Sequence, residues 1–272
     1  MQPFDRIHVR FYGETGPQVI LLHGGPGAPG DLAPLARHLG NNFRVLEPLQ
    51  RLSDSIPLTV ARHVADLYGV IHDTATDIPI RLTGHSWGAM LALTYAARYP
   101  ADIDRVVLIG CGSFDKGSRE AYQTCMAQRM NSEIKLRLNN INMQLAVEKD
   151  PQRRNESFAE LAALCTRLQS FKPLSTGSEA LVCDERGNNE TWNDALYIQE
   201  QGIQPAEFAR IQAAVTMIHG DKDPHPGPMI YKSLAPIIPT IQYHEIPRCG
   251  HMPWIEQEAR EEFFKLLGEI LS

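Results

Sequence analysis

The feature that most constrains the fold is a regular alternation of strand-like and helix-like segments over the first 112 residues. Short apolar or alternating runs, which favour strands, lie at residues 6–12, 18–22, 43–47, 78–82 and 105–109. Apolar residues at helical spacing lie between them, at residues 31–39, 59–73 and 87–99. Strands that alternate with helices pair in parallel through right-handed crossovers. The pattern therefore predicts an α/β fold with a mostly parallel sheet flanked by helices.

The alternation stops after Gly112 and resumes near residue 214. Between these points the chain has helical and loop patterns and no convincing buried strand. Strand-like and helix-like segments then return at residues 214–219, 227–234, 240–246 and 255–271. We therefore predict a core domain made of residues 1–112 and 211–272, with a helical cap, or lid, inserted as residues 113–210.

Charge and composition narrow the class of partner. The 272 residues carry a formal net charge of −6, and no block of Lys and Arg stands out. Nucleic acids and anionic membranes both reward clustered positive charge, so we expect neither as a partner. No apolar run is long enough to span a bilayer, and the N-terminus lacks a leader-like apolar region. With five scattered cysteines, the chain is expected to be a cytoplasmic monomer or small homo-oligomer with reduced thiols.

The strongest chemical signal is Gly-His-Ser-Trp-Gly at residues 84–88, which matches the pattern G-x-S-x-G. It follows a predicted strand directly and opens a predicted helix, the setting in which a nucleophile sits on a sharp turn. Glycines at 84 and 88 let strand and helix approach closely, while the serine is held in a strained conformation with its hydroxyl exposed. The alternative is a glycine-rich turn with a capping serine. The context favours Ser86 as a nucleophile.

A second glycine-rich turn, His-Gly-Gly-Pro-Gly at residues 23–27, follows the strand predicted at 18–22. Such a turn can direct backbone N–H groups into a cleft, where they would stabilise the oxyanion of a tetrahedral intermediate. We assign one donor to the N–H of Gly25 and the other to the N–H of Trp87. We also expect Gly24, Trp87 and Trp192 to contact the substrate. A plain turn is the alternative, and a phosphate loop is disfavoured because no G-K-[ST] follows.

A serine nucleophile needs an imidazole base, and the base needs a carboxylate to fix its tautomer. His251 lies in a Gly-His turn after the strand predicted at 240–246, and it is the base we select among ten histidines. Two acids, Asp221 and Asp223, follow the strand at 214–219. Each of these loops follows a strand, at the end where parallel sheets place their sites. No metal-binding spacing and no G-x-G-x-x-G occur, so we expect neither a metal nor an organic cofactor.

In motif order and in the position of the inserted helices, the chain resembles the α/β-hydrolase superfamily over nearly its whole length. The segments at 23–27 and 84–88 resemble those of the proline iminopeptidase group. This resemblance implies Asp223 as the triad acid and Gly25 with Trp87 as the oxyanion hole. A serine at the elbow distinguishes the chain from family members that use aspartate there, the epoxide hydrolases and haloalkane dehalogenases.

The chain also departs from the peptidase pattern. Proline iminopeptidases carry a D-Q-R-G-x-G-x-S-like segment after the next strand, whereas residues 47–55 here keep Gln50 and Arg51 and lose the glycines. Those enzymes use acids of the cap to hold the free amino terminus of the substrate. The acids available here near Trp192 are Glu179, Glu185 and Glu190.

Three functions therefore remain open from the sequence. The leading prediction is a serine hydrolase that cleaves a small carboxylic ester or amide through an acyl-enzyme, with Ser86, His251 and Asp223 as the triad. The second is a proline iminopeptidase-like aminopeptidase acting on short peptides. The third, of another class, is a ligand-binding protein that keeps the fold without turnover.

Overall fold

The computed structural model describes residues 7–76, 78–175 and 181–272. Its strands form one seven-stranded sheet with the order β1-β3-β2-β4-β5-β6-β7. The strands are β1 (Val9–Tyr12), β2 (Gln18–Leu22), β3 (Arg44–Pro48), β4 (Ile80–His85), β5 (Ile103–Ile109), β6 (Ala214–Gly220) and β7 (Ile241–Ile246). All neighbouring pairs are parallel except β1 with β3, which is antiparallel. The predicted fold class is confirmed.

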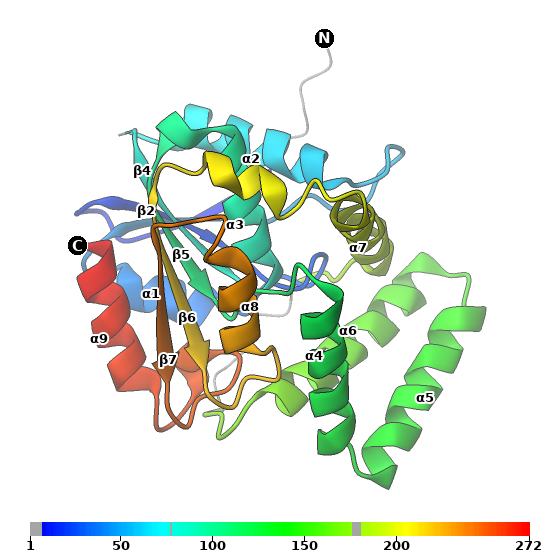
Figure 1. Cartoon of the computed structure of the whole chain (residues 1–272). Coiled ribbons are helices and arrows are strands. Elements are labelled where there is room, and N and C mark those ends of the chain that lie inside the picture. Colours follow the sequence, from blue (N-terminus) through cyan, green and yellow to red (C-terminus); the bar gives the residue numbers. More distant parts are fainter. Residues whose placement is uncertain (1–6, 77, 176–180) are drawn as a thin grey trace.

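Helices cover both faces of this sheet (Figure 1). One face carries α2 (Val60–Thr74), α3 (Trp87–Arg98) and α8 (Gly227–Leu234), whose apolar side chains join one buried cluster. The other face carries α1 (Ala33–Leu39) and α9 (Arg260–Leu271), which belong to a second cluster. Every residue of β2 is buried, as expected for a central parallel strand covered on both sides. The strands, and the loops that follow them, are thus held between two buried apolar clusters.

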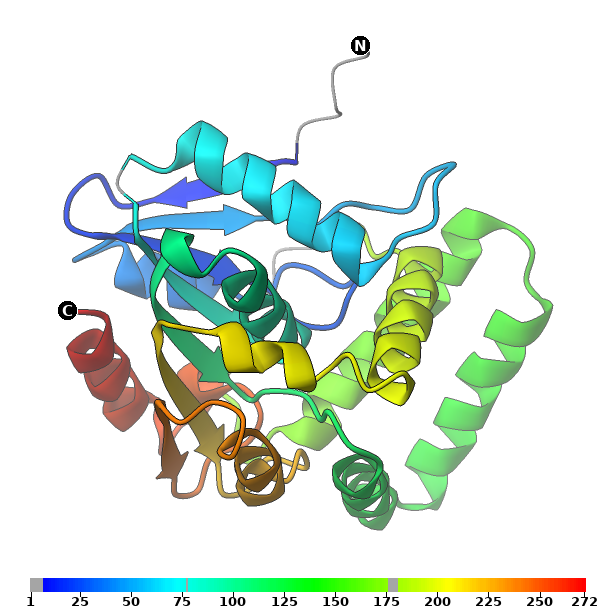
Figure 2. The same cartoon turned by 45° about the horizontal axis from the view of Figure 1, so that its top comes forward.

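Among the described residues, four α-helices lie between β5 and β6 in the chain: α4 (Lys116–Arg129), α5 (Ser132–Val147), α6 (Pro151–Gln169) and α7 (Glu185–Glu200). We call them the inserted helices. Each begins with a side-chain cap that accepts a backbone N–H, and the cap residues are Asp115, Asn131, Asp150 and Asp184. They gather to one side of the sheet, with α7 next to α2 and α5 farthest out (Figure 2). Among the described residues, no helix is both long and apolar enough to cross a membrane.

Candidate active site

Ser86 stands at the turn between β4 and α3, with φ 53° and ψ −118°. A positive φ is strained for a residue with a side chain, and here it is imposed by the tight turn. A Cβ at Gly84 would lie 2.2 Å from the carbonyl oxygen of Gly88, and one at Gly88 would lie 2.2 Å from that of Leu22. The Ser86 N–H donates to the Ile109 carbonyl at 2.9 Å. The sequence-predicted elbow is therefore present, and Ser86 itself is partly exposed.

His251 and Asp223 meet although 28 residues separate them in the chain. The Nδ1 of His251 lies 2.8 Å from Oδ2 of Asp223, and both side chains are buried. Asp221, the competing acid, instead accepts the Cys249 N–H and pairs with Lys222. The structure thus pairs His251 with Asp223 and leaves Asp221 at the edge of the loop.

Burial and electrostatic interactions set the protonation states of this pair: a neutral His251 and an ionised Asp223. Burial lowers the pKa of His251, and the Asp223 carboxylate offsets this only in part, so the imidazole stays neutral. Burial raises the pKa of Asp223, but its electrostatic interactions and hydrogen bonds with His251 and His225 outweigh this effect and leave the pKa well below its usual value. An ionised Asp223 holds the proton of His251 on Nδ1, which leaves Nε2 as the acceptor.

Two further histidines surround the same carboxylate, and no sequence motif selects them. The backbone N–H and ring Nδ1 of His225 lie 2.8 and 3.1 Å from Oδ1 of Asp223. His219 is fully buried, and its Nδ1 lies 3.7 Å from Oδ2. The only sequence signal for His225 is its place between two prolines, two residues after Asp223.

Asp223, His225 and His251 also offer ligand atoms within 4.8 Å of one another, the arrangement that could hold a metal ion. The two imidazole rings are stacked, with centroids 4.4 Å apart and an interplanar angle of 20°. An imidazole binds a metal through a lone pair in the plane of its ring. One ion cannot lie in the planes of two stacked rings, so this geometry favours a hydrogen-bonded cluster.

The glycine-rich turn at residues 23–27 lies against the elbow. A Cβ at Gly24 would lie 3.0 Å from the Cβ of Ser86, so a larger residue would require the elbow to shift by a few tenths of an ångström. Gly25 and Gly27 both have positive φ, at 39° and 78°. The inserted helices hold this turn from outside, because the Asp184 N–H donates to the Gly27 carbonyl at 2.7 Å.

Trp87, which follows Ser86, is also anchored to this turn. Its indole Nε1 donates to Gln50, and the Gln50 amide donates to the His23 carbonyl, at 2.8 and 2.9 Å. Its ring packs edge-on against Trp192 of α7, with centroids 5.6 Å apart. The Trp87 side chain is only 2% exposed. Substrate contact by Trp87, Gly24 and Trp192 therefore stays a prediction. Gln50, which the chain shares with the proline iminopeptidase pattern, links Trp87 to His23.

The acids named as possible binders of a substrate amine have other partners. Glu185 forms an ion pair with Arg154 at 2.6 Å. Glu190 accepts the Leu58 N–H at 2.8 Å and pairs with Arg186. Glu179 lies outside the described residues. Both described acids thus fasten the inserted helices.

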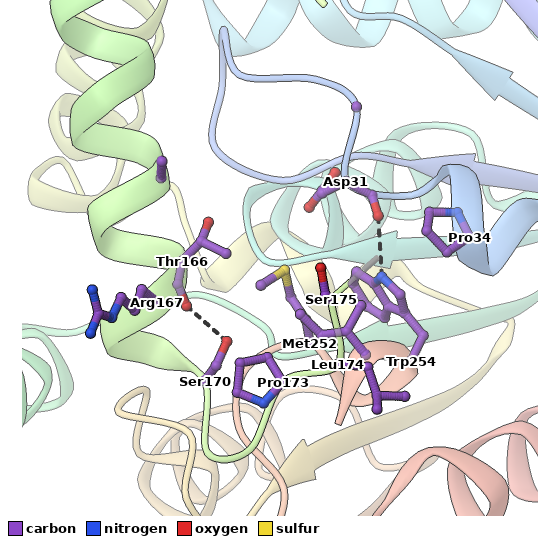
Figure 3. Close-up of a pocket in the computed structure, with 13 residues that line it drawn as sticks. Asp31, Pro34, Thr166, Arg167, Ser170, Pro173, Leu174, Ser175, Met252 and Trp254 are labelled. Carbon is purple, nitrogen blue, oxygen red and sulfur yellow. Dashed lines mark hydrogen bonds between the residues drawn. The ribbon is translucent and has the colours of Figure 1, made fainter. Parts of the chain in front are cut away.

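A cavity of about 270 Å³ opens between α6 and the loops that carry the site (Figure 3). Its walls are mainly apolar and include Leu174, Met252 and Trp254, while Asp31 and Thr166 add polar groups. Figure 3 shows the Trp254 indole donating to the Asp31 carbonyl, at 3.1 Å.

Two short connections join this cavity to the predicted catalytic residues, Ser86 and His251. Met252 directly follows His251 in the chain. The carboxylate of Asp31 lies 3.1 Å from Nδ1 of His85, the residue before Ser86, and Nε2 of His85 lies 3.2 Å from the His251 carbonyl. The cavity therefore adjoins the base side of the site.

Comparison with known proteins gives consistent matches. The family described as "Alpha/beta hydrolase family" matches residues 19–266. The chain is 24% identical to 2-hydroxy-6-oxo-2,4-heptadienoate hydrolase of Pseudomonas putida, over 95% of this chain and 90% of that protein. It is 25% identical to a proline iminopeptidase of Lactobacillus helveticus, over 97% and 94%. The crystal structure of the enol-lactonase from Burkholderia xenovorans superposes with a TM-score of 0.60 at 20% identity, covering 97% and 96% of the two chains.

Proposed function

This chain belongs to the alpha/beta hydrolase family, and from that premise we propose that it is a serine hydrolase that cleaves a small carboxylic ester or amide through an acyl-enzyme on Ser86. The family match confirms the resemblance inferred from the motifs, and the protein is a hydrolase of this fold. One observation carries the finer proposal. The strained, partly exposed Ser86 directly follows His85, whose ring lies 4.6 Å, centroid to centroid, from the ring of His251. His251 in turn pairs with the buried Asp223 carboxylate.

In the proposed reaction, His251 takes the proton of the Ser86 hydroxyl as the oxygen attacks the carbonyl carbon. Asp223 stabilises the imidazolium that forms and fixes the ring orientation. The tetrahedral intermediate collapses, His251 returns the proton to the leaving alcohol or amine, and the acyl group remains on Ser86. Water, activated by the same imidazole, then hydrolyses the acyl-enzyme and restores the serine.

The backbone N–H groups of Gly25 and Trp87 are the proposed oxyanion donors. Trp87 is the first residue of α3, where N–H groups have no partner within the helix. Gly25 lies in the turn that approaches Ser86. A donor of this kind is typically worth about 3 kcal/mol of transition-state stabilisation.

We assign the cavity of Figure 3 to an apolar part of the substrate. Its volume, about 270 Å³, is near the lower end of the range for small-molecule sites. With α6 as one wall, the inserted helices act in this proposal as the cap, residues 113–210, that shapes the pocket and excludes water.

An aminopeptidase of the proline iminopeptidase type is the second function. The Lactobacillus helveticus relative supports it. The ion pair of Glu185 and the backbone contact of Glu190 weigh against it, because these acids already have partners. Acetylating the amine of a peptide substrate separates the two functions: an aminopeptidase loses its activity, whereas an esterase or amidase keeps it.

The test of the proposal is covalent labelling. The purified protein is incubated with a fluorophosphonate probe, and the added mass is located by peptide mass spectrometry. We expect the label on Ser86 in the parent and none in His251→Ala, because only an activated serine reacts. A folded parent protein that stays unlabelled would contradict the proposal and favour a ligand-binding protein without turnover.

A further inference from the structure

We propose that His225 is a second positioning imidazole of the triad, which holds the carboxylate oxygen of Asp223 that His251 does not use and packs on the His251 ring. The inference rests on the proposed function, since it concerns how the base of that site is held. Three sets of contacts carry it.

In the first set, the two oxygens of the Asp223 carboxylate are each hydrogen-bonded to a different histidine. His251 uses Oδ2 of Asp223 at 2.8 Å, and His225 uses Oδ1 through both its backbone N–H and its ring, at 2.8 and 3.1 Å. With both oxygens engaged, the carboxylate cannot rotate without losing a hydrogen bond. Pro224 and Pro226 on either side of His225 restrict the backbone that delivers these contacts.

The second is a stack of three rings. One face of the His225 ring lies on His251, with centroids 4.4 Å apart and 20° between the planes. Its other face lies on Tyr122 of α4, at 4.3 Å and 30°. The His225 side chain is therefore held between an inserted helix and the catalytic base, and it is only 13% exposed.

The third is a separate link between the same partners. Gln169, the last residue of α6, donates its side-chain amide to the Tyr122 hydroxyl at 3.0 Å. Its carbonyl accepts the His251 N–H, also at 3.0 Å. Tyr122 and His251 are thus joined twice, through His225 and through Gln169. A base held from both sides loses little entropy on reaching its reactive orientation.

The titratable groups that face His225 are the Asp223 carboxylate, the His251 and His219 rings and the Tyr122 phenol. The electrostatic interaction with His225 contributes to lowering the pKa of His251. Removing this imidazole should therefore raise the pKa of the base, which a merely structural contact would not do.

The experiment compares two substitutions at one position. His225→Phe keeps an aromatic face and removes the ring N–H, whereas His225→Asn keeps an N–H donor and removes the stack. We expect kcat for an ester substrate to fall about 10- to 100-fold in His225→Phe with KM within about twofold, the range found for partners that orient catalytic groups. The acid limb of its kcat/KM profile should move to higher pH. His225→Asn should recover part of kcat, and His8→Phe, at an exposed histidine, is the matched control.

A readout without turnover separates this proposal from the proposed function. In proton NMR, a histidine Nδ1–H bonded to a buried carboxylate gives a resonance far downfield. We expect this signal for His251 in the parent and in Ser86→Ala, and its shift or loss in His225→Phe. An unchanged signal with unchanged kcat and pH profile in both His225 variants would overturn the role of His225. A different result would overturn only the proposed hydrolase function. In that case Ser86 of the parent is not labelled, but the downfield signal is present and changes in His225→Phe.

Discussion

The sheet and the inserted helices are stabilised in different ways. In β2, three consecutive side chains (Val19, Ile20 and Leu21) are entirely buried. In α5, Ile141 is the only buried residue, and Leu136, Met143 and Val147 are 62%, 68% and 76% exposed. The proposed triad residues Ser86, Asp223 and His251 all stand on loops of the first region. The proposed reacting groups thus rest on the buried sheet and not on the inserted helices.

The inserted helices are fastened to the core largely by carboxylates and backbone N–H groups. Asp184 accepts the N–H of Ser53, and Asp194 accepts that of Val60. A further contact is fully buried, between His63 of α2 and the Thr191 hydroxyl of α7, at 2.9 Å. Polar contacts of this kind fix orientation but contribute less to stability than burial of apolar area does. From this difference we predict that the core determines the chemistry and the stability of the protein. The inserted helices should determine its substrate specificity.

The largest expected effect is on the chemistry of the core loops. Ser86→Ala should lower kcat/KM by at least about 10⁴-fold, because the acyl-enzyme can no longer form. The free energy of unfolding should change by less than about 0.5 kcal/mol, since Ser86 is partly exposed. Ester hydrolysis kinetics and urea unfolding check the two statements. Hydrolysis at the parent rate would remove Ser86 from the mechanism.

The next effect separates the two regions by stability. Leu108→Ala, at a fully buried position of β5, should cost about 2–5 kcal/mol because it leaves a cavity in the core. Leu136→Ala, on the exposed side of α5, should change stability by less than about 0.5 kcal/mol. Urea unfolding of both variants measures the difference. Equal losses would mean that α5 is buried against something in solution.

A smaller effect is expected where α2 of the core meets α7 of the inserted helices. There, the stability of the protein should depend on pH through His63. Burial lowers the pKa of His63 to about 4, against about 6.5 in the unfolded chain. Below pH 6.5 the unfolded state therefore binds more protons, and the stability that neutral His63 permits is lost as the pH falls from about 6.5 toward 4. Between pH 7 and 5.5 this loss amounts to about 1 kcal/mol.

Urea unfolding at these two pH values tests it. His63→Asn should lose about 1 kcal/mol less than the parent on acidification, whereas His72→Asn, at an exposed position of the same helix, should behave like the parent. The same pH dependence in His63→Asn and the parent would contradict the assignment.

The smallest effect concerns specificity. Ala163 of α6 lines the cavity of Figure 3, and Ala163→Trp should fill part of it. We expect KM to rise about threefold, or about 0.7 kcal/mol, with kcat within about twofold. Ala159→Trp, about one turn earlier at an exposed position of α6, is the control. A fall in kcat with unchanged KM would show that the cavity does not bind substrate.

The sequence by itself determined the fold class and the elbow. Parallel strands and crossover helices leave a local pattern, so β2 and α8 have the predicted bounds, and β4 with α3 encloses Ser86 as expected. A glycine required by close approach is also visible locally, as at Gly84 and Gly88. These features depend on residues that lie close together in the sequence, so a short sequence motif can predict them.

Only the tertiary structure decided between Asp221 and Asp223, because that choice depends on which carboxylate reaches His251 across 28 residues. It also stacked His225 between Tyr122 and His251, the proposed base, and brought Asp184 to the turn at residues 23–27. Such contacts join segments far apart in the chain, through single hydrogen bonds and stacked rings that impose no periodicity on the sequence. The positions of these side chains follow from how the sheet and the inserted helices pack together.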